Sequence, residues 1–83
     1  MINIVFFARI REQLGVGQLT SPINQLKTVA DLRRQLIEEH EASWSEVLMA
    51  QNVVIAVNQV VSDETAEISS GDEVAFYPPV TGG

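Results

Sequence analysis

The chain contains no cysteine and a single histidine among its 83 residues. Without cysteine it has no disulfide framework, thiolate zinc site, iron–sulfur cluster or cysteine nucleophile. The lone histidine, His40, falls near the end of an expected helix, where a solvated or capping role is favoured over a catalytic one. The sequence therefore predicts that the chain by itself holds no metal and no cofactor.

Positive charge is also scarce, because five Lys and Arg oppose eleven Asp and Glu, for a net charge of −6. Phosphate backbones require a basic surface, so nucleic acid is not an expected partner. The longest apolar runs, such as residues 53–57, are far shorter than the ~20 residues that span a bilayer. The first residues also lack the basic region of a signal peptide. We expect a cytoplasmic protein with no membrane partner.

The length allows one small domain, since domains most often contain roughly 100 to 150 residues. In the absence of disulfides, the 46% apolar content must supply the whole core. We expect a domain over residues 1–77, followed by an extended tail over residues 78–83 that ends in Gly-Gly.

Hydrophobic patterning predicts strands at both ends of the chain and a helix between them. Residues 2–8 are β-branched and aromatic and predict a strand, which Gly15 and Gly17 separate from a second strand at residues 18–23. These two strands are expected to form a hairpin. Thr28 as an N-cap, with apolar residues at helical spacing as far as His40, predicts the main helix.

The second half of the chain adds a short helix and further strands. Residues 43–50 predict the short helix, and the apolar run 53–57 predicts a buried strand. A turn at Asn58 and Gln59 leads into a short strand at residues 60–61. Residues 74–77 predict the last strand, which the following prolines terminate.

This order of elements predicts an α+β fold that resembles the ubiquitin-like β-grasp, a mixed sheet of about five strands with one main helix on one face. One helix covers only one face of a sheet. Side-chain alternation places Phe7 and Tyr77 on the other face, with Val60 nearby. We expect these three residues to form a partner interface, because exposed apolar surface marks interaction sites.

The chain shows no catalytic constellation, since its acids are scattered and Gly15-Val16-Gly17 lacks the third glycine of a dinucleotide-binding loop. We interpret Arg9, Arg11 and Glu12 as structural or rim charges rather than substrate contacts.

The end of the chain has more distinctive chemistry. Prolines stiffen its exit from the last strand, and the five residues from Pro79 to Gly83 extend about 17 Å. Glycine has no Cβ, so the final residues can enter a channel too narrow for side chains and leave a carboxylate approachable. The residues expected to enter a partner's active site are Pro79, Val80, Thr81, Gly82 and Gly83.

Several stretches together resemble the small subunits of molybdopterin synthase. The stretches are Phe6-Phe7-Ala8-Arg9 with Arg11-Glu12, Ala56-Val57-Asn58, and residues 71–83, GDEVAFYPPVTGG. The resemblance covers the whole chain and implies a sulfur carrier in molybdenum cofactor biosynthesis, not an enzyme by itself. Gly83 would carry sulfur as a thiocarboxylate and donate it to form the dithiolene of molybdopterin.

The resemblance also implies the partners. A ubiquitin-activating-type adenylyltransferase would use ATP to adenylate the terminal carboxylate, and a sulfurtransferase would supply the sulfur. The large synthase subunit would use that sulfur within a heterotetramer.

Three alternatives remain open on the residues alone. A ubiquitin-like protein modifier would form isopeptide bonds through Gly83, although its tail is more typically basic than residues 78–81. A thiamine-pathway sulfur carrier is a second alternative, although the Phe-Ala-Arg and Pro-Pro-Val elements are not expected in it. A plain interaction domain would bind through its open face, with no chemistry at Gly83.

Overall fold

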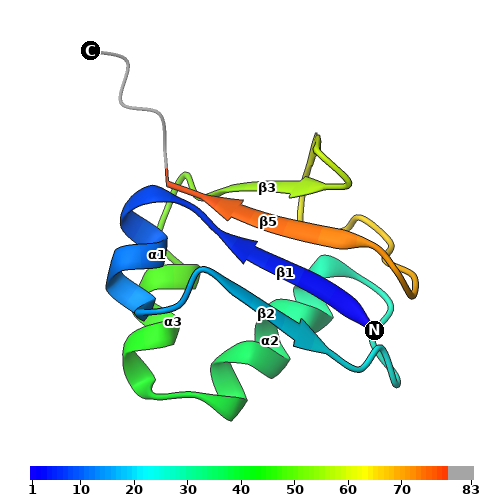
Figure 1. Ribbon diagram of the computed structural model, residues 1–83, viewed down its shortest axis with the longest axis horizontal. Helices are drawn as coiled ribbons and strands as arrows, with labels where there is room; N and C mark the ends of the chain where they lie inside the picture. Colours follow the sequence, from blue (N-terminus) through cyan, green and yellow to red (C-terminus); the bar gives the residue numbers. More distant parts are fainter. Residues whose placement is uncertain (79–83) are drawn as a thin grey trace.

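The computed structural model describes residues 1–78, which form a mixed five-stranded sheet with helices packed on one face (Figure 1). The strand order is β2-β1-β5-β3-β4; β1 and β5 run parallel and the other neighbours antiparallel. The elements are β1 (Ile2–Phe6), α1 (Ala8–Leu14), β2 (Gln18–Ser21), α2 (Val29–Glu39), α3 (Ala42–Leu48), β3 (Val54–Val57), β4 (Val60–Ser62) and β5 (Glu73–Tyr77). The predicted α+β class and mixed sheet are confirmed.

The connection between the first two strands differs from the expected hairpin, because a helix, α1, separates them. The strand ends at Phe6, and Ala8, predicted as its last residue, adopts a positive φ of 51° and begins the helix. Residues 8–14 are mostly good helix formers, and Ile10 is buried. Gly15 ends the helix in the left-handed conformation, and its N–H donates to the Arg11 carbonyl at 2.9 Å.

The main predicted helix is confirmed as α2 with Thr28 as its N-cap, and its first turn contains a capping box. The Thr28 hydroxyl accepts from the Asp31 N–H at 3.3 Å, and the Asp31 carboxylate accepts from the Thr28 N–H at 3.1 Å. At the other end, Nδ1 of His40 lies 2.8 Å from the Leu36 carbonyl, and the His40 ring stacks on Trp44 of α3. His40 therefore contacts the end of the helix, as predicted for a capping residue.

The core lies between the sheet and the helices. Phe6 and Phe76 are paired across β1 and β5, with ring centroids 5.8 Å apart, and Trp44 meets Phe6 edge-on at 5.6 Å. Leu32 and Leu36 of α2 are likewise buried. Full burial of each large side chain contributes about 1.5 to 3 kcal/mol, which explains how the chain folds without disulfides. Among residues 1–78, no helix is long and apolar enough to cross a membrane.

Candidate functional site

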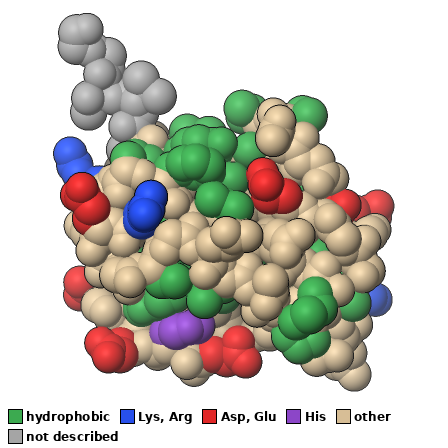
Figure 2. All heavy atoms as spheres, in the orientation of Figure 1, with side chains coloured by type: hydrophobic (Ala, Val, Ile, Leu, Met, Phe, Trp, Pro, Cys, Tyr) green, Lys and Arg blue, Asp and Glu red, His purple; other side chains and the backbone are tan. Residues whose placement is uncertain are grey.

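The face of the sheet opposite the helices is uncovered in the described part of the chain (Figure 1). The strand registers align one row of side chains across it, from β2 to β4: Gln18, Val5, Ala75, Ala56 and Val61. Figure 2 looks onto this face and shows hydrophobic side chains gathered near the end of β5. We call this surface the open face; the alanines in the middle of the row, Ala75 and Ala56, are buried, and Val61 at its edge is exposed.

An aromatic pair lies where β5 ends. The rings of Phe7 and Tyr77 stack with centroids 4.4 Å apart and an interplanar angle of 3°. The Phe7 N–H donates to the Phe76 carbonyl at 3.1 Å, which ties the start of α1 to the end of β5. Phe7 is 38% exposed, whereas Phe6 and Phe76 beside it are buried. The predicted alternation is confirmed; the role of the pair in partner binding stays a prediction.

The placement of Val60 on the open face is wrong. Val60 pairs with Val57, whose side chain packs against the core on the helix side, so Val60 points to that side at the edge of the sheet. Val61 pairs with Ala56 and lies on the open face, where it is 74% exposed. The run of two valines contains no signal for register, which strand pairing alone determines.

The predicted tail residues, Pro79 to Gly83, lie outside the described residues. β5 ends at Tyr77, the expected end of the domain, and Pro78 is half-buried. Pro78 lines a hollow of about 240 Å³ between α1 and α3, together with Arg9, Val47 and Val53. The division into domain and tail stays a prediction.

The turn between β3 and β4 is fastened to the start of β5. Asn58 and Gln59 both have positive φ, as in the tight hairpin turn that the sequence predicts. The Asn58 amide donates to Asp72 at 3.0 Å and accepts from the Glu73 N–H at 3.0 Å. Donation from the Asn58 amide and from the Ser69 N–H lowers the pKa of Asp72. Asn58, which belongs to one of the stretches that carry the resemblance, therefore has a structural role.

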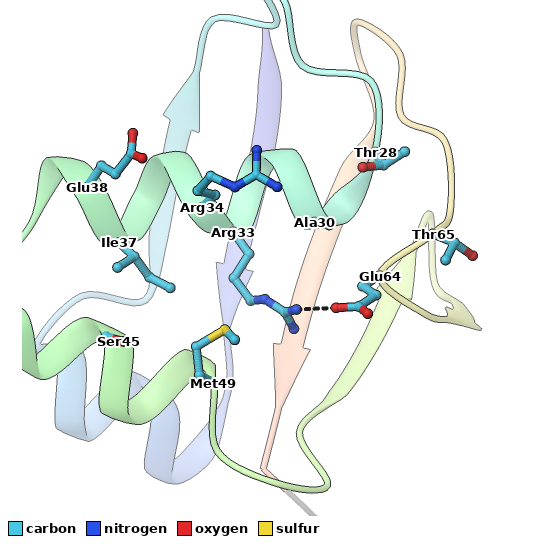
Figure 3. A pocket seen from close by; sticks show the side chains of 10 residues that line it. All are labelled: Thr28, Ala30, Arg33, Arg34, Ile37, Glu38, Ser45, Met49, Glu64 and Thr65. Carbon is cyan, nitrogen blue, oxygen red and sulfur yellow. Dashed lines mark hydrogen bonds and ion pairs between the residues drawn. The ribbon is translucent and has the colours of Figure 1, made fainter.

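A hollow of about 700 Å³ lies on the helix side, between α2, α3 and the loop after β4 (Figure 3). Arg33 crosses it to form an ion pair with Glu64. The remaining lining mixes apolar residues, such as Ile37 and Met49, with hydroxyl groups and the charged side chains of Arg34 and Glu38. No group of three potential metal-ligating side chains occurs in residues 1–78.

Comparison with known proteins assigns the family. Residues 4–83 match the model of the ThiS family. The molybdopterin synthase sulfur carrier subunit of Escherichia coli is 37% identical over 83 residues, which are 100% of both chains.

Solved structures agree on the fold. SAMP1 from Haloferax volcanii superposes with a TM-score of 0.83 at 22% identity, covering 99% of this chain and 98% of that one, and supports the ubiquitin-like β-grasp fold alone. A chain from the protein–protein complex of subunits 1 and 2 of molybdopterin-converting factor from Helicobacter pylori has a TM-score of 0.68 at 25% identity, covering 99% of this chain and 97% of that one. The chain thus belongs to the ThiS family, and its full-length relative in Escherichia coli is a molybdopterin synthase sulfur carrier subunit.

Proposed function

We propose that this chain is the sulfur carrier subunit of a molybdopterin synthase and that Gly83 carries the sulfur. The observation that carries the proposal is the match to the Escherichia coli sulfur carrier subunit over the whole of both chains. The apolar open face, with the Phe7–Tyr77 stack where β5 ends, supports it as a surface for a protein partner.

The proposed chemistry needs no catalytic side chain in this chain. A carboxylate resists nucleophiles, so ATP first converts the Gly83 carboxylate to an acyl-adenylate and releases pyrophosphate. The terminal sulfur of a sulfurtransferase persulfide then attacks the acyl carbon and expels AMP to give an acyl disulfide. A thiol cleaves its S–S bond, is itself oxidised to a disulfide, and releases the thiocarboxylate. The activating enzyme, not this chain, binds the ATP.

The large synthase subunit is the proposed acceptor. The Helicobacter pylori relative occurs in a complex of subunits 1 and 2 of molybdopterin-converting factor, which supports a two-subunit assembly for this chain. In the proposed heterotetramer, the open face contacts the large subunit while residues 79–83 enter its active site. The thiocarboxylate sulfur there becomes part of the dithiolene of molybdopterin.

Intact-mass spectrometry tests the loading step. The full chain is co-expressed with its activating enzyme and a sulfur source, and its mass should rise by the difference between sulfur and oxygen, localised to the C-terminal peptide. A chain lacking Gly83 is the control: it should not load, and its melting temperature should change little, since terminal residues contribute few packing contacts. Recovery of the chain joined to lysines of other proteins would instead support the modifier alternative.

The accepting enzyme is tested separately. Loaded chain mixed with the large synthase subunit and its cyclic pyranopterin substrate should form the dithiolene product. Loading without transfer to this substrate, but with transfer into the thiamine pathway, would support the thiamine alternative.

A further inference from the structure

Two arginines of α1, Arg9 and Arg11, form no ion pair within residues 1–78. The arginines of α2, in contrast, both pair with carboxylates. Both α1 arginines are exposed. Both stay without an ion pair although Glu12 lies on the same helix and the chain has eleven acidic residues against five basic ones; Lys27 likewise forms no ion pair within residues 1–78.

The two arginines lie on opposite flanks of α1. Ile10 between them is buried, and successive helical residues are about 100° apart, so Arg9 and Arg11 project to either side of the buried face. Arg9 lines the hollow that contains Pro78. Arg11 lies over Gly17 of the next connection, where its Nε is 2.9 Å from the position that a Cβ would occupy. Figure 2 shows basic side chains next to the hydrophobic patch of the open face, with acidic side chains beside them and on the other side of the patch.

This basic pair stands out against the charge of the rest of the chain. The net charge is −6, so all other residues together carry −8 once the two positive charges are set apart. Glu12 on the same helix and Glu46 in the hollow with Arg9 offset part of this charge, so the arginines project as two separate positive groups on either side of α1 rather than as a uniformly basic patch.

We propose that Arg9 and Arg11 contact a carboxylate-rich rim on the protein that accepts the tail. The inference rests on the proposed function. A protein rim is favoured over the phosphates of a nucleotide because the two arginines lie on opposite flanks of α1. They cannot converge on one small anion, whereas a rim that spans the helix can contact both.

Exposed charges at the edge of an interface act chiefly on the association rate, and salt screens them. The test measures association of the full chain with the large synthase subunit by stopped-flow fluorescence at low and high ionic strength. Arg9→Glu and Arg11→Glu should each lower the association rate about 3- to 10-fold at low salt, and the loss should largely vanish at high salt.

Lys27→Glu is the matched control, because it makes the same change in net charge at another exposed position, just before α2. Its association rate should stay within about two-fold of the wild type. An equal loss in all three variants would show that only net charge matters, and unchanged rates in both arginine variants would equally overturn the inference. Should Arg11→Glu impair folding through its contact with Gly17, Arg9→Glu still decides the question. Failure of the wild-type chain to bind the large subunit would contradict the proposed function instead.

Discussion

The ring of Phe7 lies flat against the ring of Tyr77, with centroids 4.4 Å apart, although the two residues come from opposite ends of the described chain. The parallel pairing of β1 with β5 brings them together, and the bond from the Phe7 N–H to the Phe76 carbonyl holds the two segments in place. The last described residues thus leave the sheet beside a rigid, partly exposed aromatic surface.

Replacing either aromatic residue should separate binding from folding. Phe7→Ala or Tyr77→Ala is expected to weaken binding of the large subunit by about 1 to 3 kcal/mol, as for interface aromatics. The free energy of unfolding should fall by less than the roughly 3 to 5 kcal/mol of a core aromatic truncation. Calorimetry with the partner and thermal melts of the free variants measure the two effects.

Phe76→Ala is the core control for this pair, since Phe76 is fully buried. It should lower the melting temperature strongly. Unchanged affinity together with a collapsed melting temperature in the Phe7 or Tyr77 variants would show that the open face has been assigned to the wrong side of the sheet.

The register of β4 allows a second test, which separates binding through the open face from binding through the edge of the sheet. Val61→Lys places a charge on the open face and is expected to weaken partner binding about ten-fold or more, because a lysine in the contact must lose hydration. Val60→Lys, on the helix side of the same edge, should have a much smaller effect. Both side chains are largely exposed, so neither change should alter the melting temperature much. Equal losses of affinity would mean that the partner contacts the strand edge rather than the open face.

The change in the free energy of unfolding at acid pH should depend in part on Asp72. Hydrogen bonds from Asn58 and Ser69 hold the pKa of Asp72 below its ordinary value of 3.8. A carboxyl group with a lowered pKa in the folded state contributes stability above the unfolded pKa, and this contribution is lost as pH falls through the folded pKa.

Asp72→Asn should therefore reduce the free energy of unfolding at neutral pH, and the difference from the wild type should shrink below about pH 4. Denaturant melts of both chains at several pH values measure this difference. A difference that stays constant from neutral to acid pH would rule out the ionised Asp72 as its source.

The capping box of α2 allows a conservative pair of substitutions. Thr28→Ala removes the hydroxyl that accepts from the Asp31 N–H and should cost about 1 kcal/mol of stability. Thr28→Ser keeps a hydroxyl acceptor and should retain most of that stability. If the serine variant melts as low as the alanine variant, the Thr28 methyl group rather than the cap is important.

Sequence alone was sufficient for features that depend on neighbours along the chain. The apolar spacing and Thr28 cap of α2, the alternation of β1 and the turn at Asn58 and Gln59 are local, because caps, periodicity and turns involve residues only a few positions apart. The resemblance of the whole chain to sulfur carrier subunits was also visible in its motifs, the final glycines included.

Tertiary structure decided what local patterns leave open. Helix α1 has seven residues, too few to be stable alone, and burial of Ile10 against the rest of the fold stabilises it. Strand pairing placed Val61 rather than Val60 on the open face, because two adjacent valines fit either register. The Phe7–Tyr77 stack likewise required the parallel contact between the first and last strands, since long-range pairing is a property of the folded chain and not of any short segment.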